Sequence, residues 1–166
     1  MMTTKVLIRK LNLTPHPEGG YFKEVYRSED EIKIDGLPQR YESTRCFGTS
    51  IYYLLEGKQF SAFHKLNSDE TWHFYLGSQI VLHLINEEGK YSKVLLGQRV
   101  DENEQLQFTI PHGTWFAAEV KDKNSFSLAG CAVYPGFDFA DFEMGDKEEL
   151  LKKFPQHKDV IQKLTR

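Results

Sequence analysis

A histidine and a glutamate stand in neighbouring strand-like stretches of the segment SAFHKLNSDETWHFYLG, which begins at Ser61. Because alternate side chains of a strand share a face, Glu70 is predicted to face the same way as Trp72, and an antiparallel partner strand would bring it to His64. A carboxylate near an imidazole favours the imidazolium and raises the pKa of the histidine. We therefore predict that His64 and Glu70 act as a general acid and base, with a mutually satisfied buried pair as the alternative.

Three further side chains are candidates for ligand binding near this pair. Trp72 and Trp115 each offer an aromatic surface for a sugar ring or a base. Glu18 is followed by two glycines that let the backbone approach a ligand, so its carboxylate could reach a ligand hydroxyl at the mouth of the site. Core packing of the tryptophans and a plain turn at the glutamate are the alternatives.

The remaining histidines are weaker candidates for a catalytic or ligand-binding role. His73 follows Glu70 by three residues, an odd spacing that sends its side chain to the opposite face of a regular strand. A single β-bulge would turn it inward, so His73 stays among the ligand-binding candidates. His83, His112 and His157 lie in an apolar strand, a turn and a polar tail, and we assign them no role.

Strand-like stretches dominate the middle of the chain. Turns that contain glycine or proline separate them, as expected where an antiparallel chain reverses. Regularly spaced short strands of this kind are typical of a sandwich or barrel. The predicted strands are residues 21–27, 49–55, 61–66, 71–76, 80–85, 91–96, 106–110, 115–120 and 126–134.

Helical patterns flank the strands at both ends. Thr3 or Thr4 can cap a short N-terminal helix, and Asp146 forms a capping box with Glu149 before an apolar helical stripe. We therefore predict a single domain made of an N-terminal helix and lead-in (1–15), a mostly β barrel (16–142) and a helical tail (143–166).

Composition excludes several classes of partner. The 166 residues are 40% hydrophobic, which suits one domain with its own core. The net charge of -3 comes from interspersed charges, so neither nucleic acid nor an anionic membrane is an expected partner. Cys46 and Cys131 are expected to be buried thiols in a cytoplasmic protein. The charged segment 28–45 is the predicted mobile loop, either a lid or merely a loop.

Five blocks of sequence extend the pattern over most of the chain. They are HPEGGYF from His16, TSIYYLL from Thr49, SDETWHFYLG from Ser68, IPHGTWFAA from Ile110 and AGCAVYPGFDFADFE from Ala129. Together they resemble the cupin branch known as domain of unknown function 985. This resemblance implies a jelly-roll barrel or sandwich, related in shape to sugar-nucleotide epimerases that work without metal. Tyr52, in the second block, joins the expected ligand-binding residues.

The resemblance also bears on metal binding. Metal-binding cupins use three histidines and a glutamate, and this chain keeps His64 and Glu70 but has Leu66 and Phe116 at the other two positions. A catalytic metal usually takes three protein ligands. No cofactor is therefore expected, and His64 and Glu70 are the residual candidates for holding a divalent metal.

Three classes of function remain open from the sequence. The first is a metal-independent isomerase, epimerase or related lyase that acts on a small polar metabolite such as a sugar or nucleotide derivative, through His64 and Glu70. The second is a non-catalytic module that binds a small molecule in the same pocket. The third is a metal-dependent oxygenase or isomerase with an unforeseen third ligand. The fold alone does not choose among them.

The strand that begins at Ile80 is apolar on both faces. Ile80, Leu82 and Leu84 face one way, and Val81 and Ile85 face the other. A jelly-roll strand normally leaves one face to solvent, so a second covering must come from the terminal helices or from another subunit. Together with the resemblance, this pattern predicts a homodimer.

Overall fold

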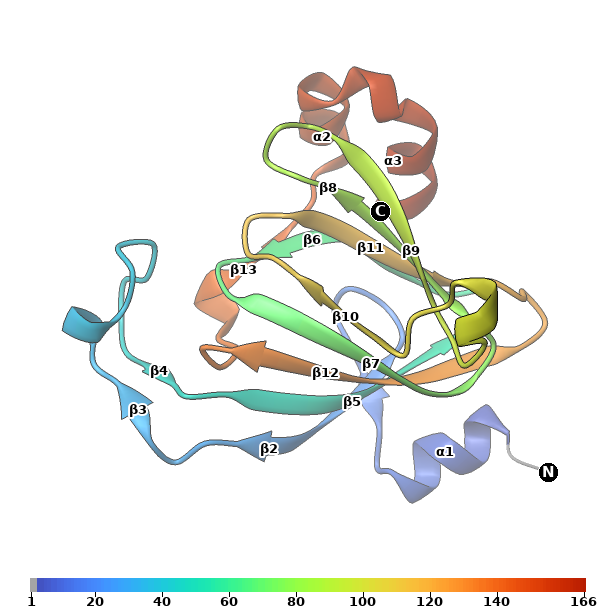
Figure 1. The fold of residues 1–166 in the computed structure, drawn as a ribbon, viewed down its shortest axis with the longest axis horizontal. Coiled ribbons are helices and arrows are strands. Elements are labelled where there is room, and N and C mark those ends of the chain that lie inside the picture. The colour runs from blue at the N-terminus through green and yellow to red at the C-terminus, as the bar shows by residue number, and fades with distance from the viewer. Residues whose placement is uncertain (1–2) are drawn as a thin grey trace.

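The computed structural model describes residues 3–166 and consists of two facing antiparallel sheets with helices at both ends of the chain (Figure 1). In spatial order, the first sheet contains β1 (Thr14–Pro15), β2 (Tyr21–Arg27), β5 (Thr49–Glu56), β12 (Phe126–Tyr134), β7 (Asp69–Gly77) and β10 (Gln107–Ile110). The second contains β13 (Phe142–Met144), β6 (Phe60–Leu66), β11 (Trp115–Val120), β8 (Ile80–Ile85) and β9 (Tyr91–Leu96). The remaining strands are the pair β3 (Glu31–Ile32) and β4 (Arg45–Cys46), and the α-helices are α1 (Thr4–Lys10), α2 (Lys147–Lys153) and α3 (Lys158–Leu164). Four 3-10 helices cover Ile34–Gly36, Val100–Glu102, Phe139–Asp141 and Pro155–His157.

The predicted mostly β sandwich is confirmed, and the two sheets pack face to face without closing into a barrel. Every predicted strand is present, and those at 21–27, 80–85, 91–96, 115–120 and 126–134 match to the residue. The sequence did not predict β1, β3, β4 and β13, because pairings of two or three residues leave no periodic pattern.

Both predicted N-cap residues accept a backbone hydrogen bond at the start of their helix. The Thr3 hydroxyl accepts a hydrogen bond from the Val6 backbone N–H at 3.4 Å, which starts α1. The Asp146 carboxylate accepts one from the Glu149 N–H at 2.9 Å, which starts α2.

The main core lies between the two sheets. Along β7, burial alternates as the strand period requires, so Glu70, Trp72 and Phe74 face inward while Thr71 and His73 are half-buried on the other face. The inward side chains of both sheets form one hydrophobic cluster that includes Tyr53, Trp72, Leu82, Phe116 and Cys131. This packing fixes the strands that carry the candidate site.

The C-terminal helices cover the outer face of the second sheet, above β6, β11 and β8 (Figure 1). Phe63, Ile85 and Ala117 pack there against Leu150 and Ile161. The second apolar face of β8 is therefore covered from within the chain. Of the two coverings that the sequence analysis considered for this face, the structure shows the terminal helices.

Cys46 and Cys131 are both buried free thiols, as predicted. Among residues 3–166, no helix is both long and apolar enough to cross a membrane.

Candidate functional site

A pocket of about 320 Å³ lies between the sheets, beside the segment that joins β12 to β13. Strands β2, β5, β6, β7, β12 and β13 all contribute to its lining. Its titratable side chains are His16, Glu18, Glu24, Arg27, His64, Glu70, Cys131 and Asp138, and the others are mainly aliphatic and aromatic.

A turn that contains two glycines positions Glu18 in the inner part of this pocket. Gly19 and Gly20 both have positive φ, and a Cβ on Gly19 would collide with the carbonyl oxygen of Phe60. The tight turn lets the carbonyl oxygen of Glu18 accept a hydrogen bond from the Ala62 N–H at 2.9 Å. The Ser61 hydroxyl then donates to Oε1 of the Glu18 carboxylate, also at 2.9 Å.

Glu18 forms a buried pair with His64. Nε2 of His64 lies 3.0 Å from Oε2 of Glu18, and Nδ1 of His64 lies 2.7 Å from the carbonyl oxygen of Ala62. A carbonyl oxygen only accepts hydrogen bonds, so Nδ1 must carry a hydrogen. One further proton must then lie between Nε2 and the carboxylate. Because Ser61 also donates to Glu18, the arrangement favours an imidazolium beside a carboxylate.

Glu70 lines the same pocket in a different electrostatic state. Burial, and next the negative charge of Glu18, raise the pKa of Glu70 from 4.5 to about 8. Its carboxyl group is therefore protonated at neutral pH. Neither Oε2 of Glu70 nor the indole N–H of Trp72 has a hydrogen-bond partner among residues 3–166. A buried carboxyl oxygen without a hydrogen-bond donor is costly to ionise, which agrees with the raised pKa of Glu70.

His16 contributes a third polar group. Its Nδ1 accepts a hydrogen bond from the Glu18 backbone N–H at 3.3 Å, and burial lowers the pKa of the ring. Burial keeps His16 a neutral imidazole, and the bond that its Nδ1 accepts places the proton on Nε2, which has no partner within residues 3–166. The same Nδ1 also lies 3.6 Å from Oε2 of Glu18, so this carboxylate is placed between His16 and His64. Its ring lies edge-on to Phe22 and Phe142, which fix its orientation.

Aromatic side chains form the outer wall of the pocket. Phe137, Phe139 and Phe142 contact one another edge to face, with centroids 5.0 to 6.2 Å apart. Arg27 lies beside them, donating to the carbonyl oxygen of Phe137 at 3.2 Å and pairing with Glu24 at 2.7 Å. The wall is therefore apolar, with a neutralised charge pair at its edge.

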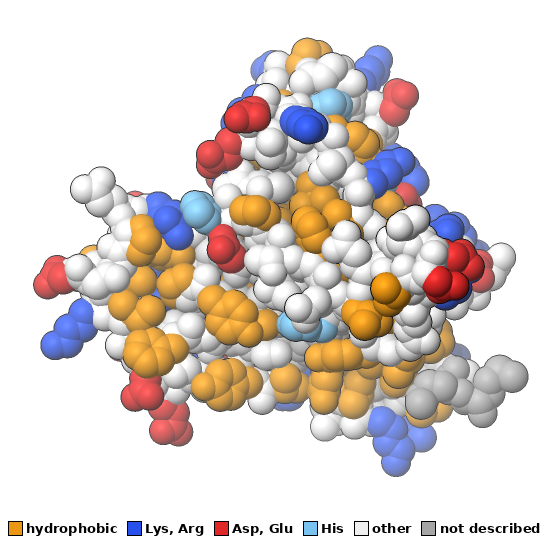
Figure 2. Space-filling model, viewed as in Figure 1, with side chains coloured by type: hydrophobic (Ala, Val, Ile, Leu, Met, Phe, Trp, Pro, Cys, Tyr) orange, Lys and Arg blue, Asp and Glu red, His pale blue; other side chains and the backbone are white. Residues whose placement is uncertain are grey.

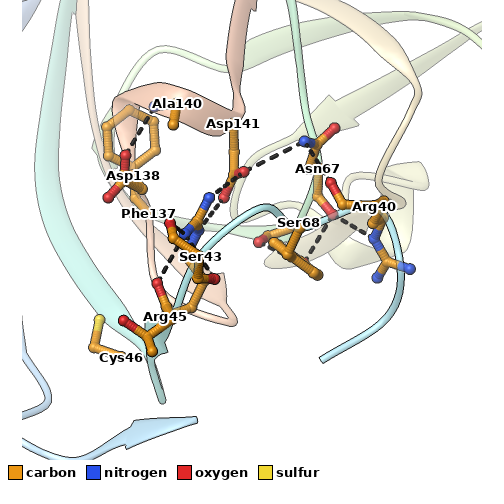
Figure 3. Close-up of polar contacts among 12 residues, drawn as sticks. Arg40, Ser43, Arg45, Cys46, Asn67, Ser68, Phe137, Asp138, Ala140 and Asp141 are labelled. Carbon is orange, nitrogen blue, oxygen red and sulfur yellow. Dashed lines mark hydrogen bonds and ion pairs between the residues drawn. The ribbon is translucent and has the colours of Figure 1, made fainter. Parts of the chain in front are cut away.

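A buried ion pair anchors this wall (Figure 3). Arg45 donates to both carboxylate oxygens of Asp141, at 2.6 and 2.7 Å, and the amide of Asn67 donates to the same carboxylate at 3.3 Å. Tyr41 is also buried, and its hydroxyl donates to the Asn67 carbonyl oxygen at 2.9 Å. The C-terminal part of the segment 28–45 is thus fixed against the pocket wall.

Replacing Asp141 by alanine should lower the free energy of unfolding by about 3–5 kcal/mol, since it leaves the buried Arg45 guanidinium unpaired. Adding Arg45→Met to Asp141→Ala should restore part of that loss, because the unpaired charge is then removed. Urea denaturation of both variants measures this. A double variant less stable than Asp141→Ala would contradict it.

The structure brings three of the predicted site residues together and leaves four outside the pocket. His64, Glu70 and Glu18 line it. The ionic contact within 4 Å joins His64 to Glu18, however, rather than to Glu70 as the sequence suggested. The candidates outside the lining are Tyr52, Trp72, His73 and Trp115.

Each of these four residues has another place in the fold. Trp72 faces inward as predicted but is fully buried in the core. Tyr52 packs on the outer face beneath α1, and Trp115 packs beneath the C-terminal helices. His73 faces away from the core, because the β7 bulge falls between Phe74 and Leu76 and not before His73.

The other histidines have structural partners. His83 is buried and bonds to Tyr91 and Glu119, at 2.7 and 3.1 Å, and burial lowers its pKa to about 4. His157 lies 2.8 Å from the carbonyl oxygen of Gly89. Neither lines the pocket.

The residues present do not fit a metal. Within residues 3–166, no group of three or more histidine, cysteine, aspartate or glutamate side chains is placed to hold an ion. Both ring nitrogens of His64 are already engaged, by Ala62 and Glu18. The Phe116 ring packs against the His64 ring in a tilted arrangement, with centroids 4.0 Å apart, and Leu66 lines the pocket. Side chains that cannot coordinate therefore fill the two positions where metal-binding cupins have histidines.

The two-sheet sandwich with a pocket between its sheets is the architecture that the resemblance to the cupins implied. The family model of the Cupin superfamily (DUF985) matches residues 5–145, so this chain belongs to that family.

Three proteins show how close the relationship is. An uncharacterized protein of Saccharomyces cerevisiae is 32% identical over 155 residues, covering 88% of this chain and 77% of its own. The crystal structure of a Shewanella oneidensis protein has a TM-score of 0.90 at 38% identity and covers 100% of this chain and 99% of its own. A hypothetical protein from Leishmania major has a TM-score of 0.88 at 36% identity, with 99% of both chains covered.

Proposed function

We propose that this cupin binds a small polar metabolite in its pocket and catalyses a proton transfer on it, as an isomerase or epimerase. The observation that carries the proposal is that one pocket holds two carboxyl groups in opposite environments, Glu18 with polar partners and Glu70 without one on its Oε2 among residues 3–166. Glu70 is held neutral, with a pKa of about 8, while Glu18 is paired with His64 at 3.0 Å. Pairs of titratable groups with such divergent environments supply an acid and a base at the same pH.

The chemistry follows from these states for a substrate with a carbonyl group beside an acidic C–H bond. The Glu18 carboxylate accepts the proton from carbon, and the electron pair of the broken C–H bond forms the C=C bond of an enol. The Glu70 carboxyl donates its proton to the carbonyl oxygen. Return of a proton to the same carbon from the other side, with the enol proton going back to Glu70, gives the epimer. Where that carbon also carries a hydroxyl group, the hydroxyl proton goes to Glu70 and a proton returns to the former carbonyl carbon, which gives the isomer with its carbonyl group moved by one carbon.

The rest of the pocket suits a compact substrate. His16 presents an N–H to a hydroxyl or carbonyl group, and the Phe137, Phe139 and Phe142 rings exclude water on the outer side. A sugar or nucleotide derivative combines apolar ring faces with hydroxyl groups, and it would match this lining.

Exchange of carbon-bound hydrogen tests the proposal. We expect wild-type protein in D2O to replace the α-proton of at least one member of a panel of sugars and sugar nucleotides, as followed by proton NMR. Glu70→Gln and Glu18→Gln should each lower the rate at least about 100-fold, as the loss of a general acid or base does. The rate should also fall above about pH 8, where Glu70 ionises.

Glu24→Gln is the matched control, because Glu24 lies at the pocket edge in an exposed pair with Arg27. It should keep most of the exchange rate. Exchange that persists unchanged in Glu70→Gln would exclude Glu70 as the acid.

A non-catalytic binding module is the second candidate. It is favoured by the full set of internal partners around Glu18, whose carboxylate oxygens already contact Ser61 and His64. Such a module would bind a member of the same panel saturably and release it unchanged, without α-proton exchange in D2O. We propose that neither function needs a cofactor, and elemental analysis of protein purified without chelators should find no first-row metal near one per chain.

We also propose that the protein is a cytoplasmic homodimer. On the side away from β5, β2 pairs only at Tyr21 and Phe22, so the rest of this edge has no strand partner within residues 3–166. Val25 and Tyr26 are exposed along it. Figure 2 shows hydrophobic side chains gathered in the lower part of this face, over the first sheet. An open edge with exposed apolar side chains is a pairing surface.

Light scattering should therefore report about twice the chain mass of 19.3 kDa. Tyr26→Lys should shift the protein to the monomer, because a charge on the edge opposes strand pairing. Leu106→Lys, at an exposed site on the other side of the first sheet, should leave the dimer intact. A wild-type monomer at micromolar concentration would contradict the dimer.

A further inference from the structure

A second hollow lies on the outer side of β6, away from the pocket. It has a volume of about 340 Å³ and lies between the end of β6, the turn before β11 and the end of α2. Its charged and aromatic lining includes Arg40, Lys65, Glu87, His112, Trp115 and Lys153. We call it the basic groove. The proposed function uses none of these side chains.

Arg40 is fixed by contacts that leave its terminal nitrogens free (Figure 3). Its Nε donates to the carbonyl oxygen of Asn67 at 2.7 Å, and its guanidinium lies over the Tyr41 ring, 5.0 Å from the centroid. The Asn67 amide donates back to the Arg40 carbonyl oxygen at 3.3 Å and to Asp141 at the same distance. The terminal nitrogens of Arg40 have no hydrogen-bond or ion-pair partner within residues 3–166. A guanidinium held in this way presents fixed donors to an oxyanion.

Two lysines of the basic groove lie on aromatic rings. Nζ of Lys65 is 4.7 Å from the Trp115 ring centroid, and Nζ of Lys153 is 5.3 Å from that of Phe154. Lys65 also pairs with Glu143 at 2.9 Å. Lys153, like Arg40, has no ionic partner in the part of the chain that the structure describes. The groove therefore keeps two cations whose charge is not compensated by a direct contact.

His112 is oriented toward the same space by Asp69. Its backbone N–H donates to Oδ1 of Asp69 at 2.8 Å, and its Nδ1 lies 2.9 Å from the same oxygen. With Nδ1 facing Asp69, Nε2 is left for another partner. Glu87 is the one carboxylate among the lining residues. Asp69 beside His112 and Glu143 beside Lys65 add negative charge at the edges of the groove, so Arg40 and Lys153 are the two cations that remain to attract an anion.

We propose that the basic groove binds the phosphoryl group of a small phosphorylated molecule, with Arg40 and Lys153 as its main contacts. Arg40 supplies directional N–H donors, while Lys153 supplies a mobile point charge, a division of roles that suits a tetrahedral oxyanion. Trp115 forms the floor, and its indole lies next to the bound group.

Because Trp115 lies in the basic groove, its fluorescence can report the binding of an anion there. Trp72 is the other tryptophan of the chain and is buried between the sheets, so Trp72→Phe leaves Trp115 as the single tryptophan, which is excited selectively near the red edge of protein absorption. Inorganic phosphate and ribose 5-phosphate are titrated at low salt, with ribose as the uncharged control. We expect a saturable change with the phosphorylated compounds and none with ribose. Calorimetry on the wild-type protein gives the same constants without the Trp72 substitution.

The two phosphate probes separate the sources of the anion. Tighter binding of ribose 5-phosphate than of inorganic phosphate identifies an organic ester as the ligand, and equal binding identifies free phosphate. No saturation with either compound, or equal signals from ribose and ribose 5-phosphate, would overturn the proposal.

Single charge removals test which side chains hold the group. Arg40→Gln should weaken binding about tenfold, and Lys153→Gln about threefold, as expected for lost charge-assisted hydrogen bonds. Lys152→Gln removes the same charge one residue away on α2, outside the lining, and should leave the affinity within about twofold. Equal losses in Lys152→Gln and Lys153→Gln would show general attraction without a site and would refute the groove.

Discussion

Replacing Glu70 by glutamine should make the protein more stable than wild type at pH 8 and above. The folded state keeps the Glu70 proton up to about pH 8, whereas an unfolded glutamate loses it near pH 4.5. Between these values the folded state binds more protons, so wild-type stability falls as pH rises. The shift corresponds to roughly 3–5 kcal/mol by pH 8, and glutamine, which cannot ionise, avoids this loss.

Urea denaturation of both proteins at pH 4, 6 and 8.5 measures the effect. The difference between variant and wild type isolates Glu70, because other titrating groups cancel. His83 is the main one, since its lowered pKa makes stability rise with pH between about 4 and 6.5 in both proteins. A difference that stays constant across this range would mean that Glu70 ionises normally in the folded protein.

Replacing Glu18 by alanine should lower the free energy of unfolding by about 3–5 kcal/mol, the usual result of removing one partner of a buried ion pair. His64 and Ser61 are both buried, and each would lose its carboxylate partner. Glu18→Gln should cost much less. Its amide can donate to Nε2 of a neutral His64, while its oxygen still accepts from Ser61.

The two substitutions therefore separate stability from chemistry. Glu18→Gln should fold well yet lose the α-proton exchange, because an amide does not accept a proton from carbon. Glu24→Ala is the control for charge alone, since its partner Arg27 is exposed and the pair is worth less than about 1 kcal/mol. Equal destabilisation by Glu18→Ala and Glu24→Ala, measured by urea denaturation, would contradict a buried Glu18–His64 pair.

The sequence predicted the fold closely because its signals are local and periodic. Strand parity placed Glu70 and Trp72 on the inner face and His73 on the outer face, as the structure has them. The N-cap residues Thr3 and Asp146 likewise located the starts of α1 and α2. Very short pairings such as β3 with β4 lack such signals and were missed.

The site was harder to predict because it depends on contacts between distant segments. The alternation of side chains shows which face of the sheet a residue is on, but it does not show whether the residue reaches the pocket or the closed core. Trp72 was therefore predicted to contact a ligand, although it lies in the core. The pairing of Glu18 with His64 depends on the positive φ angles after Glu18, which bring an early turn against β6. No periodic pattern connects these two segments.

Several pocket residues lay in recognised blocks without being assigned a role. His16 opens the first block, and Cys131 and the aromatic wall from Phe137 to Phe142 lie in the last. The three phenylalanines close together in the last block could have indicated the pocket wall. Aromatic residues in a segment between strands must be covered, either by the lining of a cavity or by a partner. The network of Arg45 and Asp141 that holds this wall could be found only in three dimensions.

The protonation of Glu70 is the central claim, and a carbon-13 NMR titration of the glutamate side-chain carboxyl groups tests it most directly. The resonance that disappears in Glu70→Gln belongs to Glu70. We predict that it titrates with a midpoint near pH 8 in the folded protein. A midpoint near the ordinary value of 4.5 would show that Glu70 is ionised at neutral pH, and the proposed acid would then be lost.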